Sequence, residues 1–310
     1  IKRSEVLDCD IKLAGDTVSK CYGVFETMHT DSEAVDCTIN ITLDCEREFA
    51  GLGKKLSKHS TVSKTRTEGQ VRLCKNANYS GLLKENVNNT IVKNCGSTIK
   101  ITKKENVSLL KNIGGLIQEN HSVIEDCIFA GAIKVGEVES KENIVTIGGI
   151  VSGNMGIIRN CENKADIYSK TDGQVGGICG IFYTEEITDC RNNGNITGGF
   201  LTGGIIGYVF RSGTLTRIFN NGNVSGVETV GGLIGKVEKN ITVDINNSYS
   251  AAVLNSETTQ PGPLIGLVEG DTTLNLDEVY WKTGLNPNLS SEYGKPFSSD
   301  PEILKTVLQL

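Results

Sequence analysis

The chain has 310 residues, of which 38% are apolar and 5% aromatic, and it contains 36 glycines and ten cysteines. This is little apolar material for a compact globule, so we expect a core of small and β-branched side chains. The net charge of −6 argues against a nucleic-acid partner for the whole chain, and no apolar run reaches the ~18 residues needed to span a membrane.

One unit recurs along the chain at intervals of 28 to 34 residues. Its most regular position, which we call the anchor column, consists of Cys9, Cys37, Thr65, Cys95, Cys127, Cys161, Cys190, Ile218 and Ser248. Nine copies at such even spacing predict an all-β solenoid of about nine stacked coils. This replaces the expectation of about two globular domains that length alone would give.

Three aliphatic columns accompany the anchor. The first lies three residues before it, at Val6, Ala34, Val62, Val92, Ile124, Ile158, Ile187, Leu215 and Ile245. The second lies six residues after it, at Leu43, Val71, Ile101, Ile133, Ile167, Ile196, Val224 and Leu254. The third follows a glycine pair, at Val24, Leu52, Leu82, Leu116, Ile150, Ile178, Ile205, Leu233 and Leu264. Three short β-prone runs per unit, interrupted by Gly and Asn, predict three strands per coil and disfavour helix.

The segments Asn192-Asn193-Gly194 and Asn220-Asn221-Gly222 are interpreted as corners, because Gly and Asn accept a positive φ. The glycine pair is assigned to a tight bend or to close packing. Side chains alternate along a strand, so the anchor and the residue three before it cannot face the same side of a regular strand. Either the chain bends near Asp189, or the cysteines do not all point inward.

Residues 1–111 form degenerate coils, in which Ala50-Gly51 and Ser80-Gly81 replace the glycine pair. Residues 51–111 carry thirteen Lys or Arg and three acids, a net +10 against −16 for the rest of the chain. On stacked coils this predicts a basic belt. The candidate contacts for an anionic partner are Lys54, Lys55, Lys58, Lys64, Arg66, Arg72 and Lys75. Solvated loops and strand edges are the alternative explanation for this charge.

Residues 112–278 hold the regular coils. Gly203-Gly204-Ile205-Ile206-Gly207 and the segment Ile187-Thr188-Asp189-Cys190-Arg191-Asn192 are typical of them. This pattern resembles the GLUG repeat of large secreted and surface proteins of bacteria, including adhesins and the repeat regions of IgA1-type metallopeptidases. The resemblance implies a right-handed parallel β-helix in an exported protein, and it implies no catalytic residue.

Residues 279–310 are expected to form a C-terminal cap or tail, opened by Val279-Tyr280-Trp281. Asp300-Pro301-Glu302 predicts the start of a short helix, and Ile303, Leu304, Val307 and Leu308 give that helix an apolar stripe. Because the chain begins inside a repeat, we expect it to belong to a longer protein with flanking domains.

The cysteines do not form the close pairs that zinc sites need, and six of the ten occupy the anchor column. We expect buried free thiols, with Cys45 and Cys74 the leading pair if a disulfide forms. His59 and His121 lie two coils apart, ~10 Å, which is too far for one metal ion. No phosphate-loop pattern is complete. The sequence therefore predicts no metal, no cofactor and no catalytic residue.

Together these features predict a non-catalytic scaffold and binding surface, adhesin-like, in a secreted or cell-surface bacterial protein. The partners considered are an acidic glycan, a cell-wall polymer or a host protein. One alternative is the positioning arm of a larger secreted enzyme such as a metallopeptidase. Another is a β-helix polysaccharide lyase or hydrolase, which would need clustered carboxylates and cations.

Overall fold

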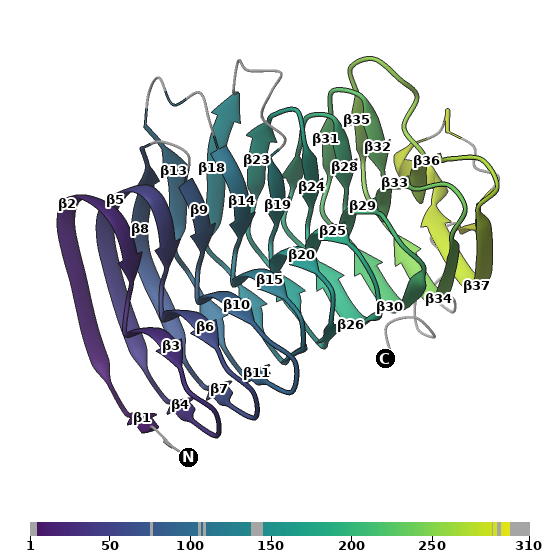
Figure 1. The fold of residues 1–310 in the computed structure, drawn as a ribbon. Helices are drawn as coiled ribbons and strands as arrows, with labels where there is room; N and C mark the ends of the chain where they lie inside the picture. Colours follow the sequence, from purple (N-terminus) through teal and green to yellow (C-terminus); the bar gives the residue numbers. More distant parts are fainter. Residues whose placement is uncertain are drawn as a thin grey trace.

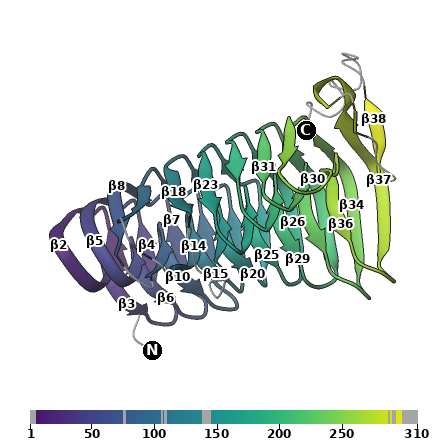
Figure 2. The ribbon, with the colours of Figure 1, turned by 90° about the horizontal axis from the view of Figure 1, so that it is seen from above.

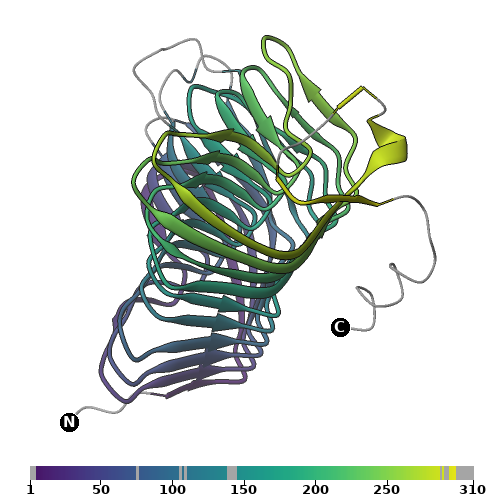
Figure 3. The same cartoon turned by 90° about the vertical axis from the view of Figure 1, so that its right-hand side faces the viewer.

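The chain folds into a right-handed parallel β-helix of about nine turns, which confirms the predicted fold class (Figure 1). The computed structural model describes residues 5–74, 77–104, 107, 110–137, 145–286, 288–289 and 293–297. Successive coils stack into an elongated rod (Figure 2) and superpose when the rod is viewed near its long axis (Figure 3). None of the described residues forms a helix of the length and apolarity that crossing a membrane requires.

One side of the rod is a sheet of nine parallel strands, one from each coil. These strands are β3 (Phe25–Met28), β6 (Gly53–Leu56), β10 (Leu83–Asn86), β15 (Ile117–Asn120), β20 (Val151–Asn154), β25 (Cys179–Phe182), β29 (Ile206–Val209), β33 (Ile234–Val237) and β36 (Ile265–Val268).

The remaining strands form one large wrapped sheet, in which neighbouring coils again pair in parallel. Strands that lead to the anchor column are β1 (Glu5–Leu7), β4 (Glu33–Val35), β7 (Thr61–Ser63), β11 (Ile91–Lys93), β16 (Val123–Glu125) and β21 (Ile157–Arg159). Strands that run through it are β26 (Glu186–Asn192), β30 (Gly213–Asn220), β34 (Thr242–Ser250) and β37 (Thr273–Lys282).

After the anchor, the first coils have long strands and the later coils have short ones. The strands that start beside the anchor are β2 (Asp10–Tyr22), β5 (Thr38–Ala50), β8 (Arg66–Leu73), β12 (Gly96–Ser97), β17 (Ile128–Phe129) and β22 (Glu162–Asn163). The next column is β13 (Lys100–Lys103), β18 (Ala132–Glu137), β23 (Ile167–Lys170), β27 (Ile196–Thr197), β31 (Val224–Gly226) and β35 (Leu254–Ser256). The last column before the glycine pair is β9 (Ala77–Ser80), β14 (Leu110–Gly114), β19 (Thr146–Gly148), β24 (Gln174–Gly176), β28 (Leu201–Gly203) and β32 (Thr229–Gly231).

The core is a set of vertical ladders made from the predicted aliphatic columns. From the second coil onward, every member of the three columns is buried, and only Val6 and Val24 in the first coil are partly exposed. In-register pairing places like on like, as where Ile158 stacks on Ile124 and Ile187 stacks on Ile158. The thin core therefore excludes water by repetition of small aliphatic side chains.

The residue before each anchor has a left-handed backbone conformation. This lets the anchor and the residue three before it both point into the core. The bend column, which consists of Asp8, Asp36, Lys64, Asn94, Asp126, Asn160, Asp189, Arg217, Asn247 and Glu278, has φ between 47° and 58°. This bend breaks the alternation, so the anchor residues from Cys37 to Ser248 are buried together with the residues three before them. The first of the two sequence-based alternatives, a bend near Asp189, is therefore confirmed.

The Asn-Asn-Gly segments do not adopt the conformation that the sequence suggested. None of Asn192, Asn193 and Gly194 has a positive φ. Asn192 is instead buried in an amide ladder, where its Nδ2 donates to Oδ1 of Asn220 at 2.8 Å and its Oδ1 accepts from Asn163 at 2.6 Å. Gly194 is required for close packing, because a Cβ there would lie 1.9 Å from the carbonyl oxygen of Ala165.

The C-terminal end of the described rod is β37, which pairs with β34 along its length and crosses the expected boundary between residues 278 and 279. Trp281 is 6% exposed and joins the core. Beyond β37 come a short 3-10 helix, η1 (Thr283–Leu285), and the strand β38 (Lys295–Phe297). The helix predicted from Asp300 onward lies outside the described residues.

Candidate functional site

The seven predicted contact residues lie on different parts of the rod. Lys54 and Lys55 are on β6 in the nine-stranded sheet, and Lys58 is in the turn that follows. Lys64 and Arg66 flank the anchor residue Thr65, whereas Arg72 lies near the end of β8. Lys75 lies outside the described residues.

Because the coils stack in register, several of these cations form ion pairs with acids one coil away. Lys54 Nζ lies 2.9 Å from Glu26 Oε1, and Lys55 Nζ lies 3.0 Å from Glu85 Oε1. The hydrogen bond from Lys54 holds the pKa of Glu26 below its usual range. These side chains are already engaged on the rod, so they are poorer contacts for a partner than their charge suggests.

Asp44 neutralises two further cations of the basic segment. Its carboxylate accepts two hydrogen bonds from the Arg72 guanidinium, at 2.7 and 3.1 Å, and lies 2.7 Å from Lys104 Nζ. Burial alone would raise the pKa of Asp44, but the hydrogen bonds from Lys104 and Arg72 outweigh it and lower the pKa. Asp44 lies on the coil before the basic segment, so counting the charges of that segment along the sequence does not reveal this pairing.

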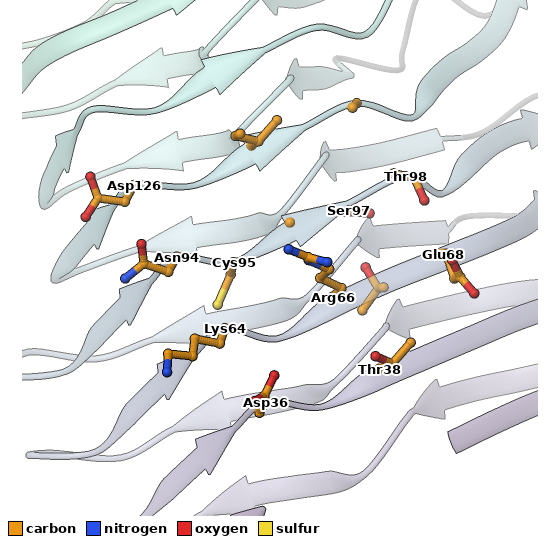
Figure 4. A pocket seen from close by; sticks show the side chains of 14 residues that line it. Asp36, Thr38, Lys64, Arg66, Glu68, Asn94, Cys95, Ser97, Thr98 and Asp126 are labelled. Atoms are coloured by element: carbon orange, nitrogen blue, oxygen red, sulfur yellow. The ribbon is translucent and has the colours of Figure 1, made fainter. Parts of the chain in front are cut away.

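Lys64 and Arg66 remain exposed, and neither makes an ion pair with another described residue. Both line a groove of about 850 Å³ (Figure 4), which we call the Gly96 groove. Its lining is Asp36, Thr38, Lys64, Arg66, Thr67, Glu68, Asn94, Cys95, Gly96, Ser97, Thr98, Asp126, Ile128 and Ala130. In Figure 4, Lys64 and Asn94 lie along one side, Thr98 and Glu68 along the other, and Arg66 between them.

The groove exists because a glycine interrupts an outward-facing ladder. Gly96 is in register with Arg66 on one coil and with Ile128 on the next. A Cβ at Gly96 would meet only the carbonyl oxygen of Ile128, at 3.5 Å, so the space above this residue is open. Gly96 therefore leaves part of the groove floor open, and side chains of the flanking coils form the walls.

The groove offers the Arg66 guanidinium at its centre, Lys64 and the Asn94 amide along one side, and the carboxylates of Asp36, Glu68 and Asp126 around them (Figure 4). Glu68 accepts a hydrogen bond from Asn40 at 2.8 Å, and Asp126 accepts one from Asn160 at 2.6 Å. Asp36 and Asp126 are three coils apart, ~14 Å at the usual strand spacing. That separation exceeds the ~6.5–9.5 Å of paired carboxylates in inverting glycoside hydrolases. Among the described residues, no group of three or more His, Cys, Asp or Glu side chains is arranged to hold a metal ion.

The sequence indicated Lys64 and Arg66 but missed Gly96 and Asn94. A signal was present, because Gly96 occupies the position just after an anchor, where other coils carry Arg66, Ile128 and Glu162. All ten cysteines are free in the structure, including Cys45 and Cys74.

Comparison with known proteins supports the fold. No protein-family model and no curated protein sequence matches the chain. Among solved structures, a protein from Bacteroides ovatus that is provisionally named an immunoglobulin A1 protease is similar, with a TM-score of 0.52 and 16% sequence identity. The alignment covers 79% of this chain and 81% of that chain. At this identity the likeness establishes a shared fold alone, and the resemblance to the GLUG repeat stays a prediction.

Proposed function

We propose that this chain is a non-catalytic repeat scaffold of an exported bacterial protein, adhesin-like, that binds an anionic partner in the Gly96 groove. The partner is an acidic glycan, a cell-wall polymer or an acidic surface of a host protein. The observation that carries the proposal is that Lys64 and Arg66 lie over one groove without an ion pair among the described residues.

The chemistry of the groove favours an anionic group at its centre. The Arg66 guanidinium binds carboxylate or sulfate oxygens through two parallel hydrogen bonds, and Lys64 adds a second positive charge. The side-chain amide of Asn94, which has no hydrogen-bond partner among the described residues, supplies a further donor. Exposed charges of this kind contribute to specificity and association rate more than to affinity, so a repeating polymer that makes several contacts is a suitable ligand.

Export is supported by the resemblance of the repeat to families of secreted and surface proteins. It is also supported by the name of the Bacteroides ovatus protein, because an enzyme that cleaves immunoglobulin A1 acts outside the bacterial cell. The same name favours a second candidate function, in which this rod is the positioning arm of a larger secreted enzyme. The two functions differ in the domains that flank this chain in the full-length protein.

A third candidate, a polysaccharide lyase, is favoured by one observation: the Gly96 groove combines Lys64 and Arg66 with the carboxylates of Asp36, Glu68 and Asp126. Incubation of the chain with polygalacturonate, alginate and hyaluronan tests this candidate. The scaffold proposal expects no unsaturated sugar product by ultraviolet absorbance. Product formation that is lost in Arg66→Ala would replace the scaffold proposal with the lyase.

The proposal is tested by an array of acidic glycans, teichoic acids and host extracellular proteins, probed with the wild type and with Gly96→Thr. Threonine at residue 96 fills the groove floor without changing the charge, and the strand accommodates it because only one atom lies within 4 Å of its Cβ. We expect binding to an anionic member of the array that is lost in the variant. A wild type that binds no anionic member, or a variant that binds equally well, would contradict the proposal.

A further inference from the structure

A second groove lies over the nine-stranded sheet, at the regular coils. It has a volume of about 350 Å³ and is bordered by Glu119 of β15, Gly153 of β20, Ile181 of β25 and Tyr183 just after β25. We call it the Gly153 groove. Its size falls at the lower end of the ~300–1,000 Å³ usual for small-ligand sites. It shares no lining residue with the Gly96 groove.

A missing side chain also creates this groove. Gly153 is in register with Glu119 on one coil and with Ile181 on the next, so the outward ladder lacks one side chain at this point. A Cβ at Gly153 would meet only Cε2 of Tyr183, at 3.5 Å, which is ordinary van der Waals contact. The Tyr183 ring therefore forms one wall of a space that a normal residue would occupy.

The aromatic wall continues along the rod. The Tyr183 and Phe210 rings meet edge to face with centroids 5.7 Å apart, and Phe210 and Tyr208 do the same at 5.7 Å. Phe210 is 38% exposed. Cations lie over the other two rings, because Lys236 Nζ is 5.4 Å from the centroid of the Tyr208 ring and the Arg211 guanidinium is 5.9 Å from that of the Phe210 ring. Of the three rings, Tyr183 lines the Gly153 groove, whereas Tyr208 and Phe210 lie two residues apart on the neighbouring coil.

Polar groups without partners face the same space. Among the described residues, neither the Tyr183 hydroxyl nor the side-chain amide of Asn112 makes a hydrogen bond, and both residues line the groove. Glu119 accepts a hydrogen bond from Gln118 at 3.1 Å and has further lone pairs to offer. Burial, together with the charges of Cys179 and Glu119, raises the pKa of Tyr183, so its hydroxyl stays protonated and able to donate.

We propose that the Gly153 groove is a subsite for one neutral pyranose ring of a glycan, stacked against the Tyr183 ring. A pyranose ring has an apolar face of C–H groups and a rim of hydroxyls. The Tyr183 ring covers such a face, while Asn112, Glu119 and the Tyr183 hydroxyl bind the rim. One aromatic wall combined with a few convergent polar groups is the usual composition of a specific small-ligand site.

The charges at this groove select a neutral ring over an acidic one. Glu119 lies in the groove, and no Lys or Arg lines it. An anionic sugar would therefore meet the like charge of Glu119 at close range. His121 Nε2 lies 3.8 Å from Glu119 Oε2 but does not line the groove. This ligand class is distinct from the anionic partner of the Gly96 groove, so the inference stands independently of the proposed function.

The test is saturation-transfer NMR and calorimetry of the 310-residue chain with cellohexaose, xylohexaose, mannohexaose and chitohexaose. We expect one of these sugars to bind the wild type and to bind about tenfold more weakly, or not at all, to Tyr183→Ala and Gly153→Val. Gly153→Ala is the second variant, because its single methyl group fits the open space at this position even if valine perturbs the coil. Gly153→Ala should weaken binding of the same sugar and leave the thermal unfolding temperature unchanged.

Gly96→Thr is the matched control, since it fills the other groove and should leave neutral-sugar binding unchanged. Failure of all four sugars to bind the wild type would overturn the proposal. Equal binding to Gly153→Ala, Gly153→Val and wild type would also overturn it, as would displacement of the sugar by an arginine-rich peptide that binds more tightly. None of these results would affect anionic binding at Gly96.

Discussion

The thiol of Cys161 donates a hydrogen bond to the carbonyl oxygen of Arg159, two residues earlier, at 3.1 Å. The same bond recurs along the anchor column, for example from Cys190 to the Thr188 carbonyl at 3.2 Å. Where the anchor is a serine or threonine, the hydroxyl donates instead, as from Ser248 to the Asn246 carbonyl at 2.7 Å. Eight of the nine anchors therefore carry a small side chain with one donor, Cys, Ser or Thr. Ile218 is the exception among them, in register with Cys190, and the last coil places Val279 in register with Ser248.

Cys161→Ser should change the free energy of unfolding by less than about 1 kcal/mol, because the hydroxyl makes the bond that the thiol makes. Cys161→Leu should destabilise by about 1–3 kcal/mol, because it overfills the stack between Cys127 and Cys190. Urea denaturation followed by circular dichroism measures both. A serine variant as unstable as the leucine variant would contradict this account of the column.

Thiol reactivity should follow burial. Only Cys9, Cys21 and Cys74 are partly exposed, and burial raises the pKa of Cys21 and of Cys74, which keeps their thiols protonated. Burial raises the pKa of Cys45 to about 11. With Ellman's reagent near neutral pH, we expect no more than these three thiols to react in the folded protein and all ten to react in denaturant without reductant. A lower count in denaturant would reveal a disulfide.

The bend column should tolerate glycine and reject β-branched residues. Asp36 has φ 58°, which strains a β-branched side chain but not glycine. We expect Asp36→Val to destabilise by about 1–2 kcal/mol and Asp36→Gly to be close to neutral. Thermal unfolding of the two variants in parallel is the measurement. Equal stability of the two would show that the bend does not require a left-handed residue.

Asp44 should make the stability of the rod pH-dependent. Because its pKa is lowered in the folded state, Asp44 stabilises the fold above its unfolded pKa of about 3.9, and this contribution is lost as the pH falls through the folded pKa. Asp44→Asn should cost about 1 kcal/mol at neutral pH, a modest value because Arg72 and Lys104 are solvent-exposed and screened. The difference from wild type should vanish in acid.

The control for this measurement is Asp16→Asn. Asp16 is exposed and makes no ion pair with another described residue, so its replacement should leave unfolding unchanged across the pH range. A constant deficit of Asp44→Asn from neutral pH down to pH values below both pKa values would show that the loss is not due to the charge.

Much of the fold was predictable because each coil of a solenoid repeats the same pattern of inward-facing and outward-facing residues. Ladder positions such as Ile124, Ile158 and Ile187 are aliphatic in each coil, so the inward columns are visible in the sequence. The Asn-rich segments do lie between strands, but the positive φ expected there was wrong, because an asparagine that turns the chain and one in a buried amide ladder look alike in the sequence. Asn192 is buried only because Asn163 and Asn220 lie directly in register with it.

The candidate site was predicted only in part, because charge along the sequence is not charge on the surface. Lys54 and Arg72 count as cations of the basic segment, yet Glu26 and Asp44 on the preceding coil neutralise them. The two glycines that open the grooves, Gly96 and Gly153, have ordinary neighbours in sequence. Their effect depends on the side chains of the coils on either side.

The central claim is that Lys64 and Arg66 hold an anionic partner in the Gly96 groove. The most direct measurement is the Kd of the anionic array ligand for Lys64→Glu/Arg66→Glu, compared with Lys100→Glu/Lys134→Glu. Lys100 and Lys134 are exposed strand residues outside the groove, so this control changes the net charge equally. The account predicts a loss of about tenfold or more for the first variant and little change for the control. Equal Kd values for the two variants would contradict it.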